Sequence, residues 1–163
     1  MLGLRLDNEE LLGLALGYFE IRTLTKAMLK IKNSVLIQVS TEKVFAFLAV
    51  PENLPLWNYY LITVNKISSG NPVVGSQYHQ IRKKDEQYFE ITGFEENKFI
   101  EFTSTRPSLV QFKRKMSFSS TNNVCAIDDV LELKSVVPSF LLRLFTKNIQ
   151  KAVNENLGKL KQL

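Results

Sequence analysis

The alternation of apolar and polar residues predicts a strand-rich chain that ends in a long helix. A half-buried strand is expected at Val35–Val39, where apolar residues recur at every second position. The same period of two continues through most of the second half of the chain. The further strands are expected over residues 61–68, 76–84, 87–95, 98–104, 109–119 and 124–134.

The helical segments lie before and after these strands. Ser40 or Thr41 is expected to begin a short helix, and the prolines at 51 and 55 leave a second short helix that ends at Trp57-Asn58. From about Pro138, apolar residues recur at spacings of three and four up to Leu160, which predicts one amphipathic helix. We therefore predict an α+β domain with a curved antiparallel sheet of about seven strands and this helix on its concave face.

The N-terminal residues differ from the rest of the chain. Residues 1–29 are interpreted as an extension with Leu-rich helical periodicity and a candidate contact for a homodimer, and residues 30–163 as the domain. The apolar run at residues 11–16 follows acidic residues and is too short to span a bilayer. We therefore expect a cytoplasmic protein without stable membrane insertion.

The turn at Glu96-Asn97 predicts the register of one hairpin. It places Ile91 opposite Phe102 and Gly93 opposite Ile100 on the inner face of the sheet. This pairing also places Phe89 near Ser104 on the same face. Because the side-chain period is two, a slip of one residue would move all of these side chains to the other face.

Two further hairpins give the candidate polar residues. A loop at residues 84–86 would place His79 on the inner face, opposite Ile91, with Arg82, Lys84 and the neighbouring basic residues on a solvated outer face. A turn at residues 120–123 would place Arg114 directly opposite Asp129 on an otherwise apolar inner face. This pair is either a structural ion pair or a polar anchor for a ligand.

Composition and charge exclude several classes of protein. The chain has 163 residues, one cysteine, one histidine and a net charge of +5. A single Cys and a single His provide no metal-binding cluster, so we expect neither a metal nor another cofactor. The basic residues are dispersed among acidic ones, so nucleic acid is not expected as a partner.

Four short segments carry a resemblance to a known family. The runs at Val35–Phe45, Pro51–Asn58, Pro72–Gly75 and Leu157–Lys161 resemble the START-related SRPBCC superfamily, in particular its polyketide cyclase/dehydrase and lipid transport-like members. The resemblance covers the chain from about Lys30 to its end. It implies the helix-grip fold with a ligand cavity between sheet and helix. The iron-dependent oxygenase branch is excluded, because it needs two histidines.

The candidate ligand-binding residues are those expected around this cavity. They are Trp57, His79, Phe89, Phe102, Phe112, Arg114, Asp129, Phe145 and Ile149. For each aromatic residue, an ordinary place in the hydrophobic core is the competing interpretation. For His79 it is a histidine of the core or rim without a functional role.

Three functions fit these residues. The first is binding or carriage of a hydrophobic small molecule such as a lipid, isoprenoid, quinone or aromatic polyketide. The second is a cofactor-independent cyclase or dehydratase acting on an enolisable carbonyl, in which Arg114 stabilises the oxyanion and His79 or Asp129 moves the proton. The third is a protein-interaction scaffold with a filled cavity. The sequence contains no recognisable catalytic constellation, which favours the first function.

Overall fold

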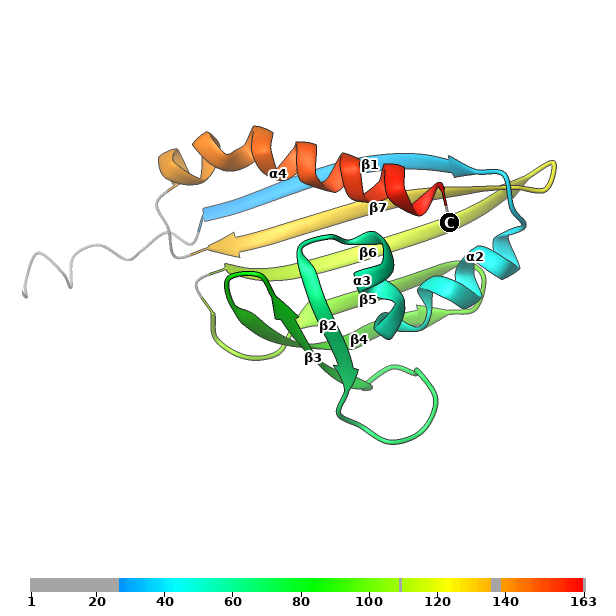
Figure 1. Ribbon diagram of the computed structural model, residues 1–163, viewed down its shortest axis with the longest axis horizontal. Coiled ribbons are helices and arrows are strands. Elements are labelled where there is room, and N and C mark those ends of the chain that lie inside the picture. The colour runs from blue at the N-terminus through cyan, green and yellow to red at the C-terminus, as the bar shows by residue number, and fades with distance from the viewer. Residues whose placement is uncertain (1–26, 109, 136–138, 163) are drawn as a thin grey trace, which may run out of the picture.

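The computed structural model contains one antiparallel sheet with helices on its concave side (Figure 1). It describes residues 27–108, 110–135 and 139–162, so the helix predicted in the N-terminal extension lies outside this part of the chain. The strand order is β1-β7-β6-β5-β4-β3-β2. The strands are β1 (Ala27–Ile37), β2 (Leu61–Lys66), β3 (Gln77–Arg82), β4 (Glu86–Glu95), β5 (Phe99–Ser104), β6 (Val110–Thr121) and β7 (Val124–Ser135).

The helices match the predicted order. They are α2 (Thr41–Leu48), the single 3-10 turn η1 (Pro51–Asn53), α3 (Leu54–Trp57) and α4 (Ser139–Leu160). Ser40 occupies the position before α2 with extended dihedral angles, as predicted for a helix start. Helix α4 runs along β1, while α2 contacts β6 and β7 and α3 contacts β2 (Figure 1). None of the described helices combines the length and hydropathy that a membrane-spanning segment requires.

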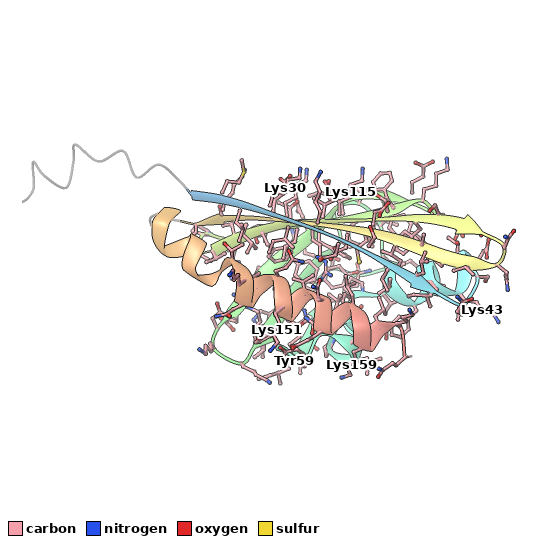
Figure 2. All side chains as sticks on the ribbon, turned by 90° about the horizontal axis from the view of Figure 1, so that it is seen from above. Lys30, Lys43, Tyr59, Lys115, Lys151 and Lys159 are labelled. Atoms are coloured by element: carbon pink, nitrogen blue, oxygen red, sulfur yellow. The ribbon has the colours of Figure 1, made fainter. Side chains whose placement is uncertain are left out.

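The two faces of the sheet differ in chemistry. Apolar side chains of β3 to β7 point to the concave face and form one core with α2, α3 and the C-terminal half of α4. Figure 2 shows Lys30 and Lys115 on the opposite face, whereas Lys151 and Lys159 lie on α4. Alternation along the strands thus produces the predicted buried face and a charged outer face.

The β4–β5 hairpin confirms the predicted register over half of its length. Ile91 pairs with Phe102 as expected, but Gly93 pairs with Glu101 instead of Ile100 because a bulge interrupts β4 between residues 91 and 93. Asn97 adopts a left-handed conformation with φ of 60°, which lengthens the turn by one residue. A Cβ atom on Gly93 would lie 2.9 Å from the Phe99 ring, so glycine permits this close packing.

The register predicted for β3 and β4 is wrong. Tyr78 pairs with Phe89, and the chain turns at Lys83-Lys84, where the Arg82 amide donates to the Asp85 carbonyl at 2.8 Å. The turn is centred earlier than predicted, so the pairing differs by three positions. An odd difference reverses the faces of one strand relative to the other. His79 consequently lies on the outer face, and Arg82 turns to the inner face.

The β6–β7 hairpin differs from its predicted register by two positions. Asn122 and Asn123, with φ of 50° and 62°, form a two-residue turn, and Arg114 pairs with Leu131. An even difference leaves every side chain on its predicted face. Arg114 and Asp129 are therefore diagonal neighbours on the concave face instead of directly opposite each other.

Candidate ligand-binding cavity

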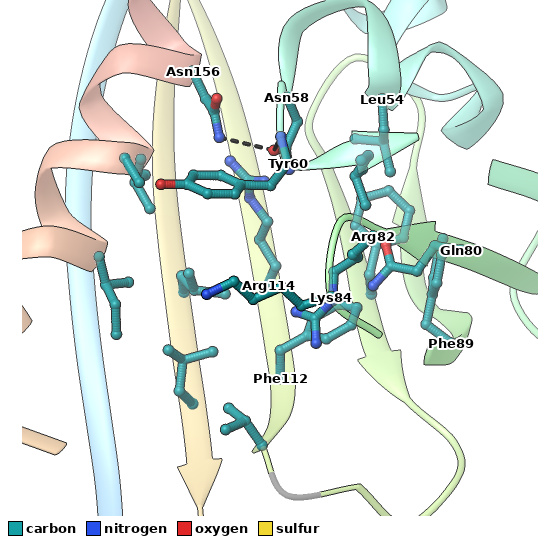
Figure 3. Close-up of a pocket in the computed structure, with 18 of the residues that line it drawn as sticks. Leu54, Asn58, Tyr60, Gln80, Arg82, Lys84, Phe89, Phe112, Arg114 and Asn156 are labelled. Carbon is teal, nitrogen blue, oxygen red and sulfur yellow. Dashed lines mark hydrogen bonds between the residues drawn. The ribbon is translucent and has the colours of Figure 1, made fainter. Parts of the chain in front are cut away.

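A cavity of about 570 Å³ lies between the sheet and α4. Its sheet side is formed by aromatic and aliphatic residues of β4 to β7, and its helix side by residues of α4 (Figure 3). The apolar members are Leu54, Leu61, Phe89, Phe102, Val110, Phe112, Leu131, Leu133, Ile149, Ala152 and Val153. Its volume lies within the range of roughly 300–1,000 Å³ that is usual for small-molecule sites. This part of the concave face is thus not filled by the described side chains, contrary to the scaffold hypothesis.

Five of the predicted site residues line this cavity. They are Phe89, Phe102, Phe112, Arg114 and Ile149. Alternation along β4, β5 and β6 directs the three phenylalanines inward, and the spacing of α4 directs Ile149 toward the sheet. Phe89 contacts the rings of Phe102 and Phe112 at centroid distances of 5.7 and 5.9 Å, which joins three strands into one aromatic wall.

Arg114 and Asp129 form a bidentate ion pair at one end of the cavity. Arg114 Nε donates to Asp129 Oδ1 at 2.7 Å and Nη2 donates to Oδ2 at 2.9 Å. The Asp129 carboxylate is fully buried and does not line the cavity, whereas the Arg114 side chain does. A guanidinium has five N–H donors, so Arg114 keeps donors for a ligand after binding Asp129.

Trp57 supports this pair from the other side of the core. Its ring is fully buried, and the Arg114 guanidinium lies 5.0 Å from the ring centroid. This contact fits the attraction of a cation to an indole ring. Trp57 was predicted as a ligand-binding residue, but it packs against Arg114 and does not line the cavity. The side chain of Phe145 lies outside the described residues.

The structure places His79 outside the cavity, whereas the sequence suggested a position on the inner face. On the outer face, its Nε2 lies 2.8 Å from Glu86 Oε2, and its ring stacks on Tyr88 at a centroid distance of 4.5 Å. The cyclase hypothesis required His79 or Asp129 to reach a substrate held at Arg114. His79 lies on the other face of the sheet, and Asp129 is buried behind Arg114. The proton carriers of that mechanism are therefore absent from the cavity.

Several polar residues of the cavity were not predicted. Gln80, Arg82 and Lys84 line it because of the reversed face of β3 and the shorter turn that follows. The prediction that Arg82 and Lys84 lie on the solvated outer face is therefore wrong, because both line the cavity. The available signal was Tyr78, whose large ring requires burial and thereby directs residues 80 and 82 inward as well.

Hydrogen bonds tie α4 to the segment before β2 beside the cavity. Asn156 Nδ2 donates to Asn58 Oδ1 at 3.0 Å, and both residues line the cavity (Figure 3). Glu155, the residue before Asn156, accepts a hydrogen bond from the Tyr59 hydroxyl at 2.8 Å. The neighbouring Tyr60 lines the cavity. The segment before β2 thus lines part of the cavity and is tied to the helix.

Neither a metal site nor a reactive thiol is found in the described part of the chain. No group of three or more His, Cys, Asp or Glu side chains in these residues is arranged to hold a metal ion. Cys125 is buried in the core, and this burial raises the pKa of its thiol. A raised pKa keeps the sulfur protonated, so Cys125 serves as a small core residue.

Comparison with known proteins establishes the fold. No protein-family model and no curated protein sequence matches the chain. A START superfamily protein from Mycobacterium smegmatis superposes with a TM-score of 0.67 at 12% identity, covering 82% of this chain and 97% of that one. A protein from Thermus thermophilus gives 0.69 at 13% identity, covering 82% and 95%. A protein from Mesorhizobium loti gives 0.64 at 16% identity, covering 82% and 95%.

These similarities confirm the fold predicted from the sequence. The chain has the START-type helix-grip fold, with a curved antiparallel sheet around a C-terminal helix. At such low identities the likeness concerns the fold alone. The residues of the cavity must therefore support any statement about its ligand.

Proposed function

We propose that this protein binds and carries a hydrophobic small molecule in the cavity between its sheet and α4. The observation that supports this function is the largely apolar lining of a cavity of about 570 Å³. Apolar surface that leaves water contributes roughly 25 cal/mol per Å² to binding. A START-type fold, which is typical of ligand-binding proteins in the superfamily that the sequence resembles, agrees with this proposal.

Different residues of the lining would provide the affinity for a ligand and determine its orientation. The aromatic wall around Phe89 and Phe112 provides apolar contact area, and Arg114 provides hydrogen-bond donors at one end. Because Asp129 neutralises Arg114, the neutral acceptors of a carbonyl, quinone or hydroxyl group fit this end. A lipid, isoprenoid, quinone or aromatic polyketide meets these requirements.

Native mass spectrometry of gently purified protein tests the proposal. We expect a bound mass that organic extraction releases as a hydrophobic molecule. In a Phe112→Trp variant, the larger ring occupies the cavity, and the bound mass should fall by about tenfold or more. The matched control is Phe99→Trp, on the outer face of β5, where Lys115 lies 4.3 Å from the ring centroid.

The control should retain the ligand at the level of the unchanged protein. The proposal fails if the protein carries no molecule and also does not bind a neutral hydrophobic probe such as N-phenylnaphthylamine. It also fails if both tryptophan variants retain a ligand equally well, because the ligand would then lie elsewhere.

A further inference from the structure

The charged residues that line the cavity are all basic. Arg82, Lys84 and Arg114 are among its lining residues, and none of the described lining residues is an Asp or a Glu. Figure 3 shows these three side chains around the pocket, two from the β3–β4 hairpin and one from β6. A concave, mostly apolar site with charges of one sign concentrates ligands of the opposite sign.

These three cations differ in their partners. Arg114 is neutralised by Asp129. Arg82 is paired with Asp85, and its Nε donates to Asp85 Oδ1 at 2.6 Å. For Lys84 the described residues provide no carboxylate partner. Lys84 is therefore a cation at the cavity whose charge is not balanced within this part of the protein.

The surrounding hairpin strengthens this positive charge. Lys83 lies beside Lys84, with its ammonium 5.2 Å from the Tyr59 ring centroid. Glu86, the acidic residue after Asp85, points to the outer face, where its Oε2 lies 2.8 Å from His79 Nε2. Its carboxylate is thus engaged on the other side of the sheet from the cavity. An anion in this part of the cavity would meet Lys84 and the paired Arg82, with Lys83 nearby outside the lining.

We propose that the ligand of this cavity is an anionic amphiphile, whose acid group pairs with Lys84 and whose apolar body lies against Phe89 and Phe112. This inference rests on the proposed function and adds a chemical class to it. The acid is a carboxylate or a phosphate monoester, because both accept hydrogen bonds from an ammonium group. The apolar body is the part that the hydrophobic wall requires.

The test compares ligands with one chain and different head groups. Binding of laurate, lauryl phosphate and lauryl alcohol is measured by displacement of N-phenylnaphthylamine, below the micelle concentration of each ligand. We expect the two acids to bind about five- to tenfold more tightly than the alcohol, and added salt to reduce this difference. Whichever acid binds more tightly identifies the carboxylate or the phosphate as the preferred head group.

Two variants, each of which removes one positive charge, test whether the acid group contacts Lys84. In Lys84→Gln, the preference for the acids should fall to about twofold or less, while the affinity for lauryl alcohol stays within about twofold. Lys98→Gln removes a lysine from the turn of another hairpin, where it pairs with Glu95, and should retain the full preference. The alcohol serves as the internal measure that the variant folds and that its cavity is intact.

The outcomes separate the two proposals. Equal binding of acid and alcohol by the unchanged protein would overturn the anionic class and leave the hydrophobic-ligand function in place. A preference for acids that persists in Lys84→Gln would overturn the role of Lys84. Failure of all three amphiphiles to displace the probe, combined with a protein that carries no ligand, would overturn both proposals.

Discussion

The two ends of the concave face are built from the same strands, yet one end is solid and the other is hollow. At the solid end, Phe45 of α2 meets Phe94 and Phe118 edge to face, at centroid distances of 5.3 and 5.2 Å. At the hollow end, Phe112 and Leu131 border the cavity of about 570 Å³. Strands β6 and β7 contribute inward-facing apolar residues to both ends.

The difference comes from the elements that cover the sheet. Helix α2 lies over the end of the sheet that carries the β6–β7 turn, where the Thr41 hydroxyl donates to the Ser119 carbonyl at 3.4 Å (Figure 1). The other end is covered by α4 together with α3, a helix of only four residues that contributes Leu54 to the lining of the cavity. An inward apolar pattern therefore defines a face, while the extent of the helices that cover it determines whether that face becomes core or cavity.

The Arg114–Asp129 pair lies at the boundary between the two ends. Along β6, Phe112 borders the cavity and Met116 lies in the core, with Arg114 between them. Asp129 is fully buried on β7 and faces Met116 in the register. The charge pair therefore lies between the filled core and the cavity.

The largest effect should come from truncating one phenylalanine at each end. Phe45→Ala removes a ring from the filled end and should lower the free energy of unfolding by about 3–5 kcal/mol. Phe112→Ala removes a ring that already borders a cavity, so we expect a loss of about 1–2 kcal/mol. Urea denaturation of both variants measures the difference.

Phe45→Leu is the milder substitution if the alanine variant does not fold, and it should still cost more than Phe112→Leu. Equal losses at both ends would show that the cavity end is as tightly packed as the other. That result would remove the contrast on which the comparison is based.

The boundary itself should be sensitive to charge. Asp129→Asn leaves the Arg114 guanidinium without its carboxylate in a mostly buried position, and we expect a loss of about 3 kcal/mol in unfolding free energy. Asp128→Asn is the matched control, because that carboxylate lies on the exposed side of β7 and accepts from the Ser34 hydroxyl. Its substitution should cost less than about 1 kcal/mol.

Chemical denaturation of the two variants under the same conditions provides the comparison. A loss in Asp129→Asn no larger than in Asp128→Asn would mean that water from the cavity solvates Arg114. The pair would then belong to the hollow end and would not mark the limit of the dry core.

Much of the fold and part of the site could be predicted from the sequence, and the register of each hairpin explains which part. In β6–β7 the predicted turn was wrong by an even number of positions, so Arg114 and Asp129 remained on the inner face. In β3–β4 the error was odd, so His79 was assigned to the inner face and Arg82 to the outer face. A side-chain period of two makes the prediction insensitive to the first error and fully sensitive to the second.

The sequence predicted a cavity between sheet and helix, but it could not show which end of the concave face holds it. The same residue types, such as Phe102 and Phe118, line a cavity at one end and fill the core at the other. Whether such a residue lines the cavity or fills the core depends on where α2 and α4 lie. The position of these helices depends on contacts between residues that are far apart in the sequence. Arg82 and Lys84 were not predicted to line the cavity for a local reason. The two-residue turn at Lys83-Lys84 contains no glycine or asparagine that would mark it in the sequence.

A smaller effect should reveal how far the dry region extends beside the cavity. Tyr78 stacks on Phe89 at a centroid distance of 5.2 Å, and Phe89, but not Tyr78, lines the cavity. Burial and the nearby Glu52 carboxylate raise the pKa of Tyr78 to about 12 from a usual value near 10. Below pH about 10 the phenol is neutral in the folded and unfolded chains, so its contribution to stability is constant there.

Between pH about 10 and about 12 the unfolded chain releases the phenolic proton and the folded chain keeps it, so stability falls as the pH rises. Relative to Tyr78→Phe, the unchanged protein should lose roughly 2 kcal/mol of unfolding free energy over this interval. The difference in ultraviolet phenolate absorption between the two proteins isolates the titration of Tyr78. If that difference titrates near pH 10, water from the cavity reaches past Phe89, and the solid region ends one strand earlier than its packing indicates.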